Sequence, residues 1–82
     1  MEFDKFRTIA IKTLKNFTEN DDLEFIKDNE EISNLNIDSM KIMEYLSCLE
    51  SKVEKKLDIE KFEAYDFILS LETIYKVFFD HK

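Results

Sequence analysis

The chain has 82 residues, 44% of them apolar and 38% charged, which suits one small globular domain and is too hydrophobic for a disordered chain. Its net charge of −7 repels a phosphate backbone, so DNA and RNA are not expected partners. The single cysteine, Cys48, forms no internal disulfide, and the sequence contains neither a signal peptide nor a long apolar stretch. We therefore expect one domain over residues 1–82, in the cytoplasm and without membrane insertion.

The sequence contains no glycine and no proline. This absence excludes the glycine-rich loops that hold nucleotide phosphates and the turn glycine of an EF-hand. Turns are expected at Asn and Asp instead, because these residues tolerate left-handed backbone and bond their own main chain. They cluster at 16–22, 28–38, 58 and 66.

Apolar side chains recur every three or four residues in two stretches, which predicts amphipathic helices over 3–17 and 39–57. The buried stripe of the central helix is expected to comprise Ile42, Leu46, Leu49, Val53 and Leu57. Residues 18–38 lack this period, so we expect a long ordered loop with room for one short helical turn. Six apolar side chains are expected to pin that loop: Leu23, Phe25, Ile26, Ile32, Leu35 and Ile37. A loop of this length is usually functional.

The last third of the chain is predicted to hold two shorter helices. One is expected at 59–64, followed by a turn over 66–69 that buries Phe67. Ser70 is expected to cap a final helix with Leu71, Ile74, Tyr75 and Phe78 on its core face. No run of alternating β-branched residues favours a sheet. The predicted fold is an all-α four-helix bundle with three longer helices, one short helix and a long first loop.

The acidic excess lies in the predicted loop, where residues 18–38 carry eight acidic side chains and one lysine. The central helix has charges of opposite sign on two flanks. Glu44 shares one flank with Met40, Met43 and Ser47, whereas the other carries Lys41, Lys52, Lys55 and Lys56. Such a surface is often only a solvated helix face. Flexible methionines beside carboxylates favour a second interpretation, a surface that binds several partners weakly.

The segment Leu35-Asn36-Ile37-Asp38-Ser39-Met40 places an Asp-Ser pair at the first turn of the central helix. An isolated Asp-Ser pair often marks only a helix N-cap. Here the helix order, the chain length, the acidic balance and the segment 67–73 accompany it. Together they resemble the acyl and peptidyl carrier proteins, whose phosphopantetheine-attachment motif is commonly Leu-Gly-x-Asp-Ser-Leu/Met. The resemblance covers essentially the whole chain and implies the acyl-carrier-protein fold.

The resemblance also implies roles for single residues. Ser39 would be the hydroxyl esterified by 4′-phosphopantetheine, which a separate phosphopantetheinyl transferase transfers from coenzyme A. Asp38 would help that transferase to recognise the site. Met40, Met43 and Glu44 occupy positions that contact partner enzymes in the family, and Ser47 lies on the same flank. The expected partners are an acyl- or aminoacyl-loading enzyme and a downstream synthase or transferase, and the carrier itself would be a non-catalytic monomer.

Three features differ from the family pattern. Asn36 stands where glycine is usual, although Asn is the best substitute for left-handed backbone. Lysines replace part of a mainly acidic central helix, and the segment 57–70 is a few residues longer than in the shortest members. The lysines and Met40 favour a dedicated pathway, such as polyketide, nonribosomal peptide or D-alanyl transfer, over housekeeping fatty-acid synthesis.

The sequence leaves a second function open, a helical adaptor that binds its partner without a covalent arm. It would use the face formed by Met40, Met43 and Glu44. Ser39 would then serve only as a helix cap.

An enzyme or a metal protein is not expected. The single histidine, His81, and the single cysteine do not form a nucleophile–base pair or a zinc site with the spacings that those sites require. The acid pairs Glu30–Glu31 and Asp21–Asp22 are typical of a solvated acidic loop.

Overall fold

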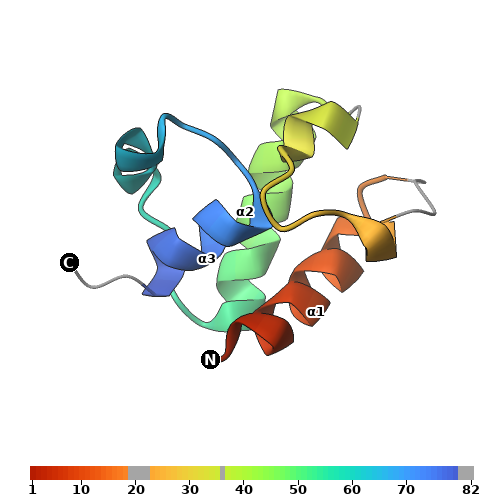
Figure 1. The fold of residues 1–82 in the computed structure, drawn as a ribbon, viewed down its shortest axis with the longest axis horizontal. Coiled ribbons are helices and arrows are strands. Elements are labelled where there is room, and N and C mark those ends of the chain that lie inside the picture. The colour runs from red at the N-terminus through yellow and green to blue at the C-terminus, as the bar shows by residue number, and fades with distance from the viewer. Residues whose placement is uncertain (19–22, 36, 80–82) are drawn as a thin grey trace.

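Figure 1 shows the computed structural model, which describes residues 1–18, 23–35 and 37–79. The described residues form three α-helices and three 3₁₀ segments and contain no strand, which confirms the predicted all-α class. The α-helices are α1 (Phe3–Leu14), α2 (Ser39–Val53) and α3 (Leu71–Phe79). The 3₁₀ segments are η1 (Leu23–Phe25), η2 (Ile32–Leu35) and η3 (Ile59–Tyr65). The predicted short third helix is thus the 3₁₀ helix η3.

Helix α2 contributes its predicted stripe to the core. All five residues of that stripe are buried in one cluster with the inner faces of α1 and α3. The helix ends at Val53, four residues earlier than predicted, because Glu54 adopts left-handed backbone at φ 60°. Leu57 remains buried beyond that end, and its backbone N–H donates to Glu50 Oε2 at 2.9 Å. The chain thus folds back toward α2 after Val53, and this bend takes the place of the last predicted helical turn.

Tyr45 is the largest fully buried side chain and was absent from the predicted stripe. Its hydroxyl donates to the Ala10 carbonyl at 3.0 Å, which joins α2 to α1. Burial raises the pKa of the Tyr45 hydroxyl well above its usual value. A tyrosine can occupy this position only because its hydroxyl finds a partner inside the core.

Helix α1 ends at Leu14 instead of residue 17. Phe17 follows in a turn in which its N–H donates to the Leu14 carbonyl at 2.9 Å. Its ring packs edge-on against the ring of Tyr45, with centroids 6.1 Å apart. Phe17 therefore packs against the core, although it lies beyond the end of α1.

The first connection, residues 15–38, is tied to the helices by polar contacts. Arg7 of α1 contacts Asp28 Oδ1 through Nε at 2.9 Å and donates through Nη2 to the Ile26 carbonyl at 2.7 Å. Backbone bonds from Ile32 N to Leu69 O and from Glu72 N to Asp28 O join the connection to the start of α3. These contacts hold the loop against α1 and α3. The loop contains two short 3₁₀ segments, whereas the sequence predicted one short helical turn.

Most of the predicted apolar pins of this connection are inside. Leu23, Ile26, Ile32 and Ile37 are buried and Leu35 packs against the core. Phe25 was wrongly predicted as a pin, because 82% of its surface is exposed. Asn36, Asp21 and Asp22, on which further expectations rested, lie outside the described residues.

The second connection, residues 54–70, has a different construction. Phe62 is buried under η3, and Asp58 caps that helix by accepting from Glu60 N at 3.0 Å. Asp66 and Phe67 both adopt left-handed backbone at φ 56°. The prediction that this turn buries Phe67 is wrong, since its side chain is 61% exposed.

Ser70 has the predicted capping role. Its Oγ accepts from Thr73 N at 3.1 Å, and the serine is itself buried. Of the predicted core face of α3, Leu71, Ile74 and Phe78 are buried, whereas Tyr75 is only half-buried.

Candidate functional site

The predicted Asp-Ser pair stands where the first connection enters α2. Ile37 is buried and holds the chain against the core one residue before the pair. Asp38 has extended backbone, and its Oδ1 accepts from Lys41 N at 2.9 Å. Asp38 is therefore the N-cap of α2, and Ser39 is the first residue of the helix. The idea that Ser39 itself is the cap is wrong.

Ser39 is exposed in this arrangement, as are its neighbours Asp38 and Met40. In the first turn of an α-helix the backbone N–H groups have no partner within the helix, and the helix dipole places partial positive charge there. The Asp38 side chain satisfies the N–H of Lys41, and the first turn contains no acidic residue. The N-terminal start of α2 therefore has partial positive charge beside the exposed Ser39 hydroxyl.

The four predicted partner-binding residues share one exposed face of α2. Met40, Met43, Glu44 and Ser47 are spaced three and four residues apart, and all are exposed. Met40 is 77% exposed and Met43 is 51% exposed, although methionine is usually an interior residue. This face begins one residue after Ser39.

A small apolar cleft of about 110 Å³ borders this face. It is lined by Met43, Leu46, Ile59, Phe62, Phe67 and Leu69, which come from α2, η3 and the turn before α3. Sequence reasoning missed the cleft because it placed Phe67 in the core. No sequence signal indicates the left-handed backbone of Asp66 and Phe67, where the Phe67 side chain is exposed.

The remaining candidates form no site within the described residues. No group of three or more His, Cys, Asp or Glu side chains there is placed to hold a metal ion. Glu31 is exposed and Glu30 half-buried, and Cys48 is a partly exposed free thiol. His81 lies outside the described residues.

No helix among the described residues is both long and apolar enough to cross a membrane. Searches with this chain against protein-family models, curated proteins and solved structures find no match.

Proposed function

We propose that this protein is an acyl carrier that bears 4′-phosphopantetheine on Ser39. The main support for the proposal is that Asp38 caps α2, which leaves the hydroxyl of the next residue, Ser39, exposed. Asp38 accepts the N–H of Lys41 and ends the loop, so the neighbouring Ser39 hydroxyl is exposed and takes no part in capping. The family resemblance of the Asp-Ser motif supports the same residue.

The surroundings of Ser39 suit a phosphodiester. The first-turn N–H groups and the positive end of the helix dipole favour its negative charge, and Lys41 adds a cation in the same turn. When attached, the group supplies a thiol that holds an acyl or aminoacyl cargo as a thioester. The residues of the chain would position this arm without reacting themselves.

The exposed face of α2 supports contact with partner enzymes. Methionine side chains adapt to different surfaces, so Met40 and Met43 suit weak binding to several partners in turn. Because the phosphopantetheine arm tethers the cargo to the carrier, the cargo meets a partner's active site at high effective concentration once the carrier has bound that partner. The cleft beside Met43 offers apolar cover for a small part of the cargo.

The charge of α2 supports a dedicated pathway over housekeeping fatty-acid synthesis. Lys41 lies on the flank opposite Glu44, so the first turns of α2 are not uniformly acidic. A partner with a strongly basic docking surface would gain little from it. We therefore propose a role in polyketide, nonribosomal peptide or D-alanyl transfer.

The test is the intact mass of the purified protein after incubation with coenzyme A and a promiscuous phosphopantetheinyl transferase. The expected result is a gain of one phosphopantetheine in wild type and in Ser51→Ala, and no gain in Ser39→Ala. Ser51 is the matched control because it is an exposed serine of the same helix and is not among the four predicted partner-binding residues. No gain in a folded wild-type protein, or an unchanged gain in Ser39→Ala, would overturn the proposal.

Asp38 allows its two roles to be separated. Asn caps a helix as well as Asp does, so Asp38→Asn should preserve the melting temperature, whereas Asp38→Ala should cost about 0.5–2 kcal/mol. If the charge of Asp38 is needed by the transferase, Asp38→Asn will be loaded more slowly than wild type despite equal stability. Equal loading rates would leave Asp38 with the capping role alone.

The second candidate, an adaptor without a covalent arm, is favoured by the exposure of Met40 and Met43. Both functions predict that Met43→Asp weakens partner binding, because a carboxylate replaces an apolar contact. Only the carrier loses its function with Ser39→Ala, a change that leaves the docking face intact. A partner that still responds fully to Ser39→Ala would favour the adaptor.

A further inference from the structure

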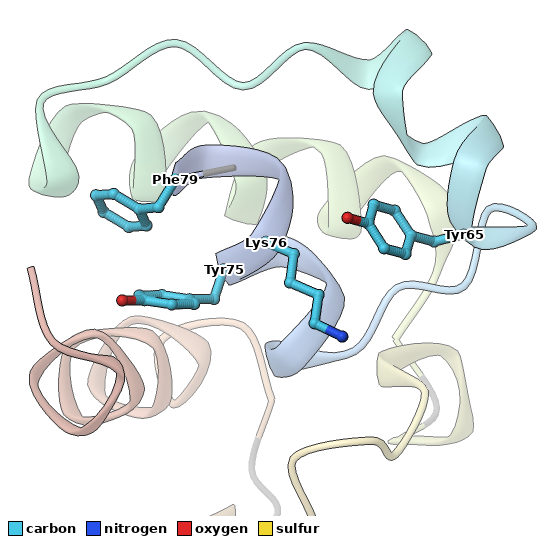
Figure 2. Close-up of a pocket in the computed structure, with 4 residues that line it drawn as sticks. All are labelled: Tyr65, Tyr75, Lys76 and Phe79. Carbon is cyan, nitrogen blue, oxygen red and sulfur yellow. The ribbon is translucent and has the colours of Figure 1, made fainter. Parts of the chain in front are cut away.

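A second hollow lies on a different part of the molecule, between α3 and η3. It has a volume of about 390 Å³ and is lined by Tyr65, Tyr75, Lys76 and Phe79. Figure 2 shows the ring of Tyr65 on η3 turned toward α3, with Lys76 between Tyr65 and the other two rings. Three aromatic side chains and one lysine therefore line a space of the size that small molecules occupy in proteins.

The rings of Tyr75 and Phe79, which line the hollow, are held in place by contacts with the core. Tyr75 and Phe79 are in contact at 4.8 Å between ring centroids. The fully buried Phe6 lies against both of them, at 5.3 Å and 6.4 Å. The Tyr75 hydroxyl also donates to the Met1 carbonyl at 2.6 Å. A ligand would meet rings that are already ordered, which lowers the entropy cost of binding.

Two lysines bring positive charge to these rings. Lys55 Nζ stands 4.6 Å from the centroid of the Phe79 ring, and Lys76 Nζ stands 5.9 Å from that of Tyr65. Lys76 also forms an ion pair with Glu72 at 3.2 Å, and both side chains are about half exposed. The pair is open to solvent, so a second carboxylate can compete for Lys76 at small cost.

We propose that this hollow binds a small aromatic carboxylate. The ligand's ring would pack against the ring of Tyr75, and its carboxylate would pair with Lys76. Aromatic cages without lysines select cations, but here ammonium groups already occupy the faces of Phe79 and Tyr65. A cationic ligand would meet both lysines as like charges.

This site is separate from the proposed carrier function. Lys55 follows the C-terminal end of α2 and Ser39 begins that helix, so roughly 20 Å of helix lies between them. In Figure 1 the start of α2 and the C-terminal end of α3 lie on different sides of the molecule. The hollow can therefore fill or empty whether or not Ser39 is modified.

The test is a titration of the isotopically labelled full chain, followed by amide chemical shifts in NMR. The probes are phenylacetate, its neutral counterpart phenylacetamide and its cationic counterpart phenethylammonium. Phenylacetate is expected to shift the amides of Tyr65, Tyr75, Lys76 and Phe79 with a dissociation constant of about 1 mM, since it has few atoms. Phenylacetamide should bind about fivefold more weakly, and added salt should reduce the difference.

Two variants sharpen the assignment. Lys76→Met keeps the apolar stem but loses the charge. This variant should bind phenylacetate about fivefold more weakly than wild type and should bind phenylacetamide equally well. Glu72→Gln removes the competing carboxylate and should strengthen phenylacetate binding severalfold. Lys12→Met, which changes an exposed lysine of α1, is the control and should change nothing. Tighter binding of phenethylammonium than of phenylacetate, or equal binding by wild type and Lys76→Met, would overturn the proposal.

Discussion

The two connections that flank α2 differ in how they are held. The first, residues 15–38, is fixed by an arginine, by backbone bonds to α3 and by buried apolar side chains, and none of its described residues has left-handed backbone. The second, residues 54–70, contains all the left-handed residues of the described chain, Glu54, Asp66 and Phe67, and exposes Ile59, Phe67 and Ile68. The first connection positions the exposed Ser39, whereas the second lines the apolar cleft beside it.

This difference indicates how a chain without glycine divides its tasks. The loop before Ser39 is bonded at several points, and these bonds fix the position of that residue. Sparsely populated backbone and exposed apolar groups cost stability and tend to gather at functional surfaces. In this protein the left-handed residues lie in the second connection together with the exposed Ile59, Phe67 and Ile68, although Phe25 of the first connection is exposed as well.

The largest expected effect comes from the core of the first connection. Ile32 is fully buried in η2, so Ile32→Ala should lower the free energy of unfolding by about 2–4 kcal/mol. Ile68→Ala, in the exposed part of the second connection, should change it by less than about 0.5 kcal/mol. Urea denaturation followed by circular dichroism measures both values. Equal losses for the two variants would remove the contrast between the connections.

The polar tie of the first connection should come next in size. Arg7→Met keeps an unbranched apolar stem but loses the bonds to Asp28 and the Ile26 carbonyl. We expect a loss of about 1–2 kcal/mol, discounted for partial exposure of the ion pair. Hydrogen exchange should accelerate around residues 23–35 and stay unchanged in η3. Lys5→Met, on the exposed face of α1, is the control, and similar behaviour of the two variants would contradict the proposed tie.

Alkaline pH tests α2 itself, the element that joins the two connections. Burial raises the pKa of Tyr45 in the folded protein, whereas the same hydroxyl deprotonates near pH 10 when the chain is unfolded. The unfolded state then binds fewer protons, so stability should fall by up to about 1.4 kcal/mol per pH unit above pH 10. Tyr45→Phe should cost about 1 kcal/mol at neutral pH, through loss of the bond to Ala10, and should flatten this slope. If the free energies of unfolding of wild type and Tyr45→Phe fell in parallel above pH 10, the loss of stability could not be assigned to Tyr45.

The smallest expected effect is a gain at the strained end of α2. Glu54 is a non-glycine residue at φ 60°, so Glu54→Gly should raise the free energy of unfolding by about 0.5–1 kcal/mol. Glu60→Gly, placed within η3, should lower it by a similar amount. Denaturation midpoints of the two variants give the comparison. A loss of stability in Glu54→Gly would show that its backbone is not strained.

The sequence predicted the features that depend on periodic apolar side chains. The all-α class, the stripe of α2, and Ser70 as a cap all follow from spacing and side-chain chemistry, and the structure confirms them. The exposed positions of Ser39 and Met40 also agree with the motif. What those residues bind stays a prediction.

The errors lie where tertiary contacts override local pattern. Tyr45 belongs to the core only because Ala10, 35 residues away, accepts its hydroxyl. Phe25 and Phe67 read as core residues by type, yet both are exposed. The early end of α2 depends on Glu54 taking a conformation that sequence preference assigns to Asn, Asp or Gly. None of these outcomes has a signal in residue spacing.

The most direct test of the carrier proposal is to locate the modification by fragment mass spectrometry of the protein loaded from coenzyme A. The chain contains five serines, at positions 33, 39, 47, 51 and 70, so the assay chooses among defined hydroxyls. The account predicts a single phosphopantetheine on Ser39. A modification on any other serine, or none on a folded protein treated with several transferases, would contradict it.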